Sequence, residues 1–301
     1  MHRCPLINSE MKIALPAPAK VNLHLHITGR REDGYHELYT RMQKLDYCDG
    51  VELELNNTGV VKIDCDNKNL GADQSNLALR AAHKFFHAYD RKGHRGLTIK
   101  LYKHIPIAAG LGGGSSDGAA VLKGLNELFG FPLSEGDLID CGRSLGADCA
   151  FFISAHDAVV ATGIGDKLER AAPVDKYHYL LVNPGIHVQT SWVYDNYRLT
   201  KKGDKFIFPG SLNNDDQEFT PAELHNDLEE VTVARHPVIA QVKKLLMEAG
   251  AAGALMSGSG PTVFGLFEND KSAEAAALSL TQRWGNETGY RIISTKAFDG
   301  A

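Results

Sequence analysis

The spacing of the apolar positions changes on the two sides of one glycine-rich stretch, which spans 105–117. Before it, Leu97, Ile99 and Leu101 alternate with polar side chains, which predicts a strand. After it, apolar residues recur at helical spacing over 119–128, which predicts a helix. The sequence therefore predicts a strand, a glycine-rich loop and a helix in succession.

The same two spacings predict elements elsewhere in the chain. Alternation over 21–28 predicts a half-buried strand whose polar face carries Asn22, His24 and His26. Strands over 51–55 and 60–63 are expected to form a hairpin around the intervening turn. Further strands are expected over 158–161, 179–182, 262–267 and 291–295, and helices over 77–86 (capped near Ser75), 134–146 (with a capping box at Ser134), 238–246 and 272–284. The polar stretch 200–220 predicts a long loop or an insertion, and residues 1–10 predict a loose tail.

The glycine-rich loop has the properties of an anion site. Glycines at 110 and 112–114 allow backbone conformations closed to other residues and a close approach to a ligand. Ser115, Ser116 and Asp117 are favourable N-cap residues for the helix that follows. Because a helix N-terminus presents unpaired N–H groups and a partial positive charge, the loop is suited to a polyphosphate. The alternative is an ordinary capped turn, but three consecutive glycines would then cost chain entropy without using the bare backbone.

Common nucleotide-binding motifs do not match this loop. No Gly-Lys-Ser/Thr occurs, which excludes a Walker A loop. Ser115 stands where the dinucleotide fingerprint requires its third glycine. The His-Arg-Asp and Asp-Phe-Gly motifs of the protein kinases are also missing from the sequence.

Composition and charge narrow the class of protein. With 43% hydrophobic and 23% charged residues in 301, the chain is an ordinary globular protein with room for two domains. A net charge of −5 gives no general nucleic-acid footprint. The five cysteines are scattered without a Cys-x-x-Cys, so we expect reduced thiols in a cytoplasmic protein rather than disulfides or a zinc site. No run spans a bilayer, and residues 1–10 do not resemble a signal peptide.

Three further features have a structural and a functional interpretation. The pattern alone favours a solvated surface lysine for Lys20. Asp148 follows a predicted helix end and precedes an apolar run, where a cap or turn residue is commoner than a base, although perturbed carboxylates do cluster at sites. A second glycine loop, over 257–261, is equally consistent with a plain turn and with ligand contact.

The stretch 106–120 resembles the phosphate loop of the GHMP kinases, the small-molecule kinases of galactose, homoserine, mevalonate and phosphomevalonate. Four more stretches, 18–23, 29–38, 145–148 and 257–260, appear in the order found in one branch, the 4-diphosphocytidyl-2-C-methyl-D-erythritol kinases. The Gly-Tyr-His sequence at 34–36, with Pro-Ala-Lys at 18–20, separates this branch from other GHMP kinases. The resemblance covers nearly the whole chain from about residue 12.

The resemblance implies a two-domain α+β GHMP kinase fold. The N-terminal ATP-binding domain is expected over 11–170 and to resemble the second domain of a small-subunit ribosomal protein. The C-terminal domain is expected over 171–301 as a ferredoxin-like α/β sandwich. Ala150 departs from the proline that the family often carries there, and residues 1–10 have no counterpart. Neither departure removes a chemical group.

The resemblance also implies the reaction and its residues. ATP, accompanied by Mg²⁺, would phosphorylate the 2-hydroxyl of the cytidyl substrate, with Asp148 as general base and Lys20 as its cationic partner. Tyr35 would stack on the cytosine, His36 would hydrogen-bond to it, and Tyr194 would cover its other face. The substrate residues are completed by Asn22 and Thr190. The ATP-binding residues would be Pro106, Gly110, Leu111, Gly112, Gly113, Gly114, Ser115 and Ser116.

Two other functions compete with this one. The first is a GHMP kinase for another alcohol, such as homoserine or a sugar, against which the Tyr35–His36 pair argues. The second is a non-catalytic nucleic-acid-binding protein with a related first-domain fold, which the acidic balance disfavours. We expect a small-molecule substrate with a cytidine diphosphate group, no nucleic-acid or membrane partner, and a monomer or weak homodimer.

Overall fold

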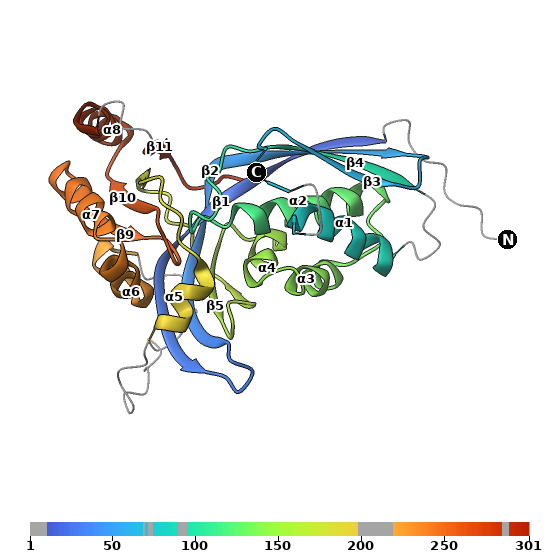
Figure 1. Cartoon of the computed structure of the whole chain (residues 1–301), viewed down its shortest axis with the longest axis horizontal. Helices are drawn as coiled ribbons and strands as arrows, with labels where there is room; N and C mark the ends of the chain where they lie inside the picture. Colours follow the sequence, from blue (N-terminus) through green and yellow to red (C-terminus); the bar gives the residue numbers. More distant parts are fainter. Residues whose placement is uncertain are drawn as a thin grey trace. The chain divides into compact units, whose positions relative to one another are not determined.

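The structure is a computed structural model that describes residues 11–68, 70–71, 75–89, 95–197, 219–284 and 289–300. These residues form two compact units whose segments interleave along the chain (Figure 1). Unit 1 holds the described residues of 1–17, 48–104 and 113–155. Unit 2 holds those of 18–47, 105–112 and 156–301. The sequence analysis expected two consecutive domains, 11–170 and 171–301, and that division stays a prediction. The contacts divide the chain differently, into interleaved segments.

The strands of unit 1 are organised around β4 (Gly96–Tyr102). The C-terminal part of β2 (His36–Asn56) pairs with β4 antiparallel, with Leu53 opposite Ile99. On the other side, β3 (Val61–Cys65) pairs with β4 in parallel. Alternate β4 residues Leu97, Ile99 and Leu101 are buried, as the sequence pattern predicts.

The hairpin expected between 51–55 and 60–63 is wrong, because β4 lies between these two strands. The turn itself forms, and Thr58 N and Oγ both donate to Asn56 Oδ1. The strand after the turn continues through α1 (Leu77–Ala88) into β4, which makes a β-α-β unit. The helix returns the chain so that β4 runs in the same direction as β3, which is the connection that a parallel pair needs.

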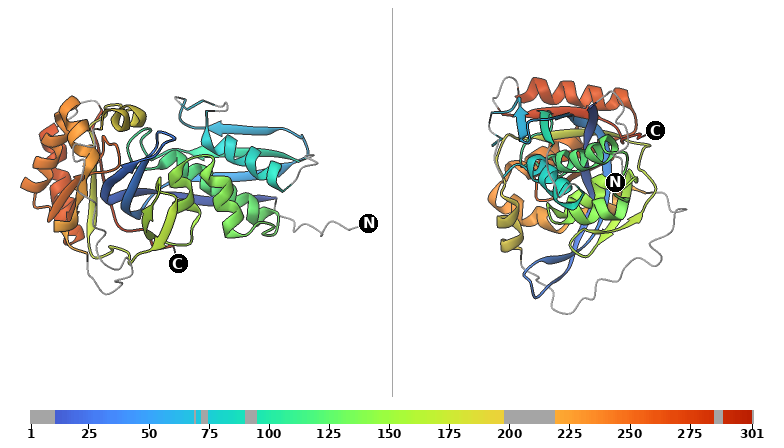
Figure 2. Two further views of the ribbon diagram at one scale, coloured as in Figure 1. Left: turned by 90° about the horizontal axis from the view of Figure 1, so that it is seen from below. Right: turned by 90° about the vertical axis from the view of Figure 1, so that its right-hand side faces the viewer.

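Four helices complete unit 1: α1, α2 (Gly113–Leu128), α3 (Glu135–Arg143) and α4 (Ala147–Ile153). Their apolar faces share one core with the strands, in which Phe85, Leu122 and Phe152 are buried. In Figure 2 the turquoise and green helices lie together along the strands of this unit. The capping box at Ser134 is confirmed, with Asp137 as its partner, whereas the cap of α1 is Asn76 rather than Ser75.

Unit 2 contains a four-stranded antiparallel sheet in the order β11-β7-β10-β9. Its strands are β7 (His178–Asn183), β9 (Gly253–Met256), β10 (Val263–Phe267) and β11 (Arg291–Thr295). Helices α5 (Thr190–Asn196), α6 (Asp227–Arg235) and α7 (Val238–Glu248) lie between β7 and β9 in the chain, and α8 (Asp270–Trp284) lies between β10 and β11. This β-α-β-β-α-β order, with the strands arranged 4-1-3-2, is the expected ferredoxin-like arrangement.

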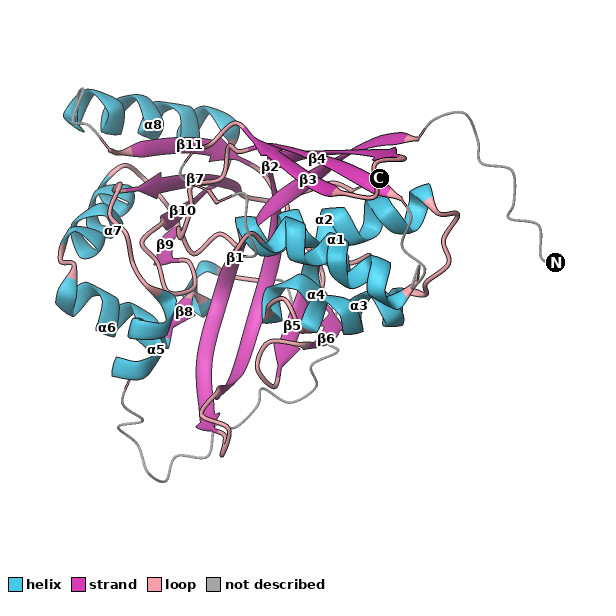
Figure 3. Ribbon diagram, turned by 45° about the vertical axis from the view of Figure 1, so that its right-hand side comes forward, coloured by secondary structure: helices cyan, strands magenta, loops and turns pink. Residues whose placement is uncertain are grey.

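The two faces of this sheet have different roles. Leu180 and Val182 of β7 pack in one core with α7 and α8, which lie beside the sheet in Figure 3. Tyr179 and Leu181 point to the opposite face and share a second core with β1 (Lys12–Arg30) and the loop 105–112. The sheet therefore supports the strand that carries Lys20 and the first half of the glycine-rich loop.

The remaining strands of unit 2 are short. β5 (Ala158–Thr162) pairs antiparallel with β2 and with β6 (Lys167–Arg170), and β8 (His225–Asn226) pairs in parallel with β1. A 3₁₀ turn, η1 (Pro221–Glu223), precedes β8. The sequence patterns missed α5, α6, β6 and β8, each of nine residues or fewer. The loop expected over 200–220 and the tail over 1–10 lie wholly or mostly outside the described residues. None of the described helices combines the length and the apolar character that crossing a membrane requires.

Candidate active site

The first half of the glycine-rich loop lies against the second glycine loop within unit 2. Gly110 and Gly112 have φ angles of 75° and 73°, in the left-handed region that favours glycine. A Cβ on Gly110 would lie 2.2 Å from Ser257 O, so only glycine allows this approach. The Ser257 hydroxyl donates to Gly110 O at 2.8 Å. The stretch 257–261 is therefore more than a turn, because it fixes the backbone of the first loop.

The second half of the loop is the start of α2, in unit 1. The helix begins at Gly113, so Ser115, Ser116 and Asp117 lie in its first two turns and do not cap it. That expectation was wrong because the glycines themselves adopt helical conformation. The consequence is that the first N–H groups of α2 belong to residues with no or small side chains. Among the described residues, the buried Ser116 Oγ has no hydrogen-bond partner.

Lys20 is not the solvated lysine that the pattern alone favoured. It is 4% exposed, and its Nζ donates to Asn22 Oδ1 at 2.6 Å. Asn22 Nδ2 donates in turn to Thr40 Oγ1 at 2.8 Å, and the Thr40 hydroxyl donates to His24 O at 2.6 Å. The backbone N–H of Lys20 donates to Leu111 O at 3.0 Å. The lysine is thus held by its own strand and by the glycine-rich loop.

Two of the expected substrate residues lie at the second glycine loop. A Cβ on Gly258 would be 3.5 Å from Asn22 Oδ1, which places this amide beside the loop. The Thr190 hydroxyl, at the first position of α5, is 2.9 Å from Ser259 Oγ. Unit 2 therefore brings Asn22 and Thr190 to one loop, although they are 168 positions apart in the sequence.

The aromatic residues expected to hold the cytosine gather at the start of β2. His36 is 9% exposed, and its ring centroid lies 5.5 Å from that of Tyr194. Tyr197, which the sequence analysis did not select, makes an edge contact with His36 at 6.1 Å. Burial, and after it the charge of Arg30, lowers the pKa of His36. Tyr35 is 62% exposed, which leaves its ring open to a ligand.

Asp148 lies in the first turn of α4. Gly146 is the N-cap of that helix, rather than the end of α3 as expected. Cys149 Sγ lies 3.6 Å from Ser115 O, so the start of α4 packs on the start of α2. Within unit 1, Asp148 therefore belongs to the helix end that lies beside the first turn of α2.

The described structure thus groups the predicted residues by unit. Lys20, Asn22, Tyr35, His36, Thr190 and Tyr194 belong to unit 2 together with Pro106, Gly110, Leu111 and Gly112. Asp148 belongs to unit 1 together with Gly113, Gly114, Ser115 and Ser116. The pairing of Lys20 with Asp148 in catalysis stays a prediction.

A buried charge cluster in unit 1 escaped the sequence analysis. Lys103 Nζ contacts Asp49 Oδ2 and lies 2.6 Å from Asp117 Oδ2, and all three side chains are almost fully buried. Burial raises the pKa of Asp117 to about 7, against the opposing charge of Lys103. The only signal in the sequence was Asp117, which we interpreted as a cap.

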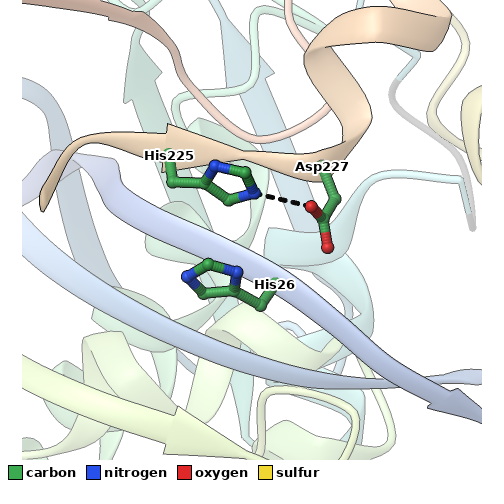
Figure 4. A group of neighbouring side chains, drawn as sticks. All are labelled: His26, His225 and Asp227. Carbon is green, nitrogen blue, oxygen red and sulfur yellow. Dashed lines mark hydrogen bonds and ion pairs between the residues drawn. The ribbon is translucent and has the colours of Figure 1, made fainter. Parts of the chain in front are cut away.

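A second cluster that was missed joins β1 to the start of α6 in unit 2 (Figure 4). The rings of His26 and His225 stack with centroids 4.4 Å apart and an interplanar angle of 12°. His225 Nε2 lies 2.6 Å from Asp227 Oδ1. His24 stacks on Tyr39 and is buried, which lowers its pKa to about 3.

Family models match both halves of the chain. The GHMP kinases N terminal domain matches residues 76–161, and the GHMP kinases C terminal domain matches residues 210–286. Together with the glycine-rich loop and the ferredoxin-like sheet, these matches show a GHMP kinase with the expected two-domain α+β fold.

Curated relatives show to which branch of the GHMP kinases the chain belongs. A 4-diphosphocytidyl-2-C-methyl-D-erythritol kinase of Syntrophotalea carbinolica is 49% identical over 93% of this chain and 97% of its own length. One of Geobacter sp. strain M21 is 46% identical over 91% and 96%. A crystal structure of 4-(cytidine 5'-diphospho)-2C-methyl-D-erythritol kinase is 33% identical, covering 95% of this chain and all of its own, with a TM-score of 0.74. The chain belongs to the family of the 4-diphosphocytidyl-2-C-methyl-D-erythritol kinases.

A homoserine kinase of Cytophaga hutchinsonii is similar in fold alone. Its TM-score is 0.75 over 97% of this chain, but its identity is 19%. The fold is therefore common to kinases of different alcohols, and the choice of substrate depends on the side chains that the fold carries.

Proposed function

We propose that this chain transfers the γ-phosphoryl group of ATP to the 2-hydroxyl of 4-diphosphocytidyl-2-C-methyl-D-erythritol, a step in isoprenoid precursor synthesis by the non-mevalonate pathway. The observation that carries the proposal is its identity of 43–49% to relatives of that name over most of both chains. The same likeness disfavours homoserine or a sugar as the acceptor, because the homoserine kinase shares the fold at only 19% identity.

The glycine-rich loop binds the ATP phosphates in this proposal. Its backbone N–H groups and the N-terminus of α2 supply donors and a partial positive charge for an anion. Ser116 Oγ, buried and without a partner among the described residues, fits a phosphate oxygen or the Mg²⁺ that accompanies it. When bound, the ion neutralises part of the charge that develops on the transferred group.

Lys20 and Asp148 are assigned the chemistry at the acceptor. Asp148 takes the proton of the 2-hydroxyl, and the ammonium of Lys20 stabilises negative charge on the attacking oxygen. Asn22 holds the lysine in place through its 2.6 Å hydrogen bond. Phosphoryl transfer depends mainly on such positioning and electrostatics, so a rigid lysine is more effective than a mobile one.

The cytosine is bound between aromatic side chains of unit 2. Tyr35 offers an exposed face for stacking, Tyr194 covers the opposite face, and His36 hydrogen-bonds to the base. Thr190, near Ser259, contacts the remainder of the substrate. The substrate is a small molecule, and we propose that the enzyme acts in the cytoplasm as a monomer or weak homodimer.

A substrate panel tests this function. The purified chain is given ATP and Mg²⁺ with the cytidyl substrate, with the same alcohol lacking the cytidyl group, with homoserine and with galactose. We expect kcat/KM for the cytidyl substrate to exceed that for each of the others by at least about 10³-fold, since a polar site rejects ligands that leave it unpaired. Preference for any acceptor without cytidine would refute the proposal.

A further inference from the structure

The cluster of His26, His225 and Asp227 carries three metal-ligating side chains outside the proposed kinase site. One ligand atom of each residue lies within 4.8 Å of the others. His26 lies on β1, His225 on β8 and Asp227 at the first position of α6. Figure 4 shows the ring of His225 joined to Asp227 and the ring of His26 lying below that of His225. Nothing in the kinase mechanism uses these groups.

The carboxylate of this cluster is already oriented by its surroundings. Asp227 Oδ2 accepts a hydrogen bond from the backbone N–H of Ile27 at 2.6 Å, which leaves Oδ1 directed at His225. Partners of this kind fix ligating groups in metal sites and increase their affinity.

The pairing of β8 with β1 brings the two imidazoles close together. β8 pairs with β1 in parallel, with the Cα of His225 opposite that of His24. His26, two residues further along β1, lies on the same strand face and stacks on the His225 ring.

We propose that His26, His225 and Asp227 bind a divalent transition-metal ion, preferentially Zn²⁺. Two imidazoles and one carboxylate with an open fourth position are a ligand set that zinc uses in proteins. Ligand distances of about 2.0–2.2 Å place two ligand atoms about 3.4 Å apart in a tetrahedral site. His225, with 49% of its side chain exposed, can rotate to admit the ion between itself and Asp227.

The ion takes no part in the phosphoryl transfer, because its ligands lie far from Lys20. His26 is six residues from Lys20 on the same strand, which separates their Cα atoms by about 20 Å at the usual rise of a strand. A bound ion would crosslink β1 to the first turn of α6. The three ligands come together only in the folded chain, so the ion binds the folded state and raises the thermal unfolding midpoint.

Direct zinc titration of the full chain tests the site. The chain is stripped with EDTA and titrated with Zn²⁺ in competition with a chromophoric chelator, and with Co²⁺ while its visible d–d absorption is recorded. The variants are His26→Phe and His225→Phe, which keep a ring in the stack, and Asp227→Asn, which keeps the shape of the side chain. His83→Phe, at an exposed position on α1, is the matched control.

We expect one equivalent of Zn²⁺, an increase in the unfolding midpoint with Zn²⁺ but not with Mg²⁺, and tetrahedral Co²⁺ bands. Each of the three variants is expected to weaken zinc binding by about 10–100-fold or more, since the loss of a group that only hydrogen-bonds to a metal ligand already has an effect of that size. His83→Phe should bind as the parent chain does. The proposal would be overturned if the chain had no saturable zinc site with a dissociation constant below about 100 µM, because structural zinc sites bind much more tightly than that. Unchanged affinity in those variants that retain a cooperative unfolding transition would also overturn it.

Discussion

Lys20 Nζ donates a 2.6 Å hydrogen bond to Asn22 Oδ1, and both side chains are almost fully buried on one face of β1. The amide of Asn22 cannot rotate without losing a hydrogen bond, because its Nδ2 donates to Thr40 Oγ1. The oxygen of Asn22 is therefore fixed toward the lysine. A charged group restricted in this way suits a reaction that depends on preorganised electrostatics.

The first prediction concerns the charge of Lys20. Lys20→Met keeps most of the length of the side chain and removes the ammonium, so kcat should decrease by at least about 10²-fold, the effect of losing one preorganised charge donor. The dissociation constant for ATP should change little. Steady-state kinetics and nucleotide titration measure both. Lys12→Met, on the same strand but in a surface pair with Glu52, is the control and should retain full activity.

The second prediction concerns the base. Asp148→Asn should lower kcat by about 10²–10⁴-fold, the usual contribution of a positioned general base, while the binding of both substrates is retained. Single-turnover phosphoryl transfer separates this loss from product release. Asp64→Asn, at an exposed position of β3, should have no effect. Full activity of Asp148→Asn would remove Asp148 from the mechanism.

The third prediction separates close approach from backbone strain. Gly110 and Gly130 share a φ of 75°, but only at Gly110 would a Cβ meet the backbone, 2.2 Å from Ser257 O. Gly130→Ala should destabilise the chain by about 1–2 kcal/mol, from the left-handed conformation alone. Gly110→Ala should cost about 1–3 kcal/mol more, since overpacking adds to the strain, and should weaken ATP binding. Urea unfolding and nucleotide titration measure these effects, and equal behaviour of the two variants would contradict the described packing of the loops.

The fourth prediction concerns the cytosine. Tyr35→Ala should raise KM for the cytidyl substrate by roughly 5–150-fold, because stacking of one base on an aromatic ring contributes about 1–3 kcal/mol. KM for ATP should stay within about twofold. Phe131, at 67% exposure, offers a matched exposed ring, and Phe131→Ala should change neither constant. A rise in KM for ATP alone would place Tyr35 at the nucleotide instead.

The fifth prediction concerns pH. The pKa of Asp117 is raised from 3.8 to about 7 in the folded chain, chiefly by burial. Between about pH 4 and pH 7 the folded state therefore holds more protons at this carboxyl than the unfolded state does. This group's contribution to stability is present below pH 4 and is lost as the pH rises through 7.

Asp117→Asn removes that titration, so the stability of the variant relative to the parent should increase from pH 5 to pH 7 and then level off. Urea unfolding at a series of pH values measures the difference. Asp140→Asn is the control, since its side chain is 71% exposed and pairs with Arg143 at the surface. A constant difference across the range would show that Asp117 does not titrate there.

The same cluster depends on its cation. Lys103→Met leaves two buried carboxylates without that cation, so it should lower the free energy of unfolding by about 3–5 kcal/mol at neutral pH.

Local patterns predicted most of the long elements. The alternation that forms β4, the apolar stripe of α2 and the capping box at Ser134 depend on residues near one another in sequence. The pairing of β3 was missed because it depends on the crossover through α1. The short α5 and α6 carry too few apolar residues to show a period, and Leu228 and Thr232 are the buried residues of α6.

The candidate site was predicted through resemblance more than through pattern. Alternation over 21–28 placed Asn22 on the polar face of a strand, and the pattern favoured a solvated lysine at position 20. Neither indicated that both side chains are buried. The contact of Gly110 with Ser257 joins loops 147 positions apart, and the stack of His26 on His225 joins residues even further apart. Contacts of this kind arise from tertiary packing, so no local spacing reveals them.

A crystal structure of the chain with a non-hydrolysable ATP analogue and the cytidyl substrate tests the central claim most directly. We predict triphosphate oxygens at the backbone N–H groups of 110–116, cytosine against Tyr35 and His36, and the accepting hydroxyl within about 3.2 Å of an Asp148 oxygen, the reach of a general base. The ammonium of Lys20 should lie beside the same hydroxyl. A different carboxylate facing that hydroxyl, or a triphosphate bound away from the glycine-rich loop, would contradict the account.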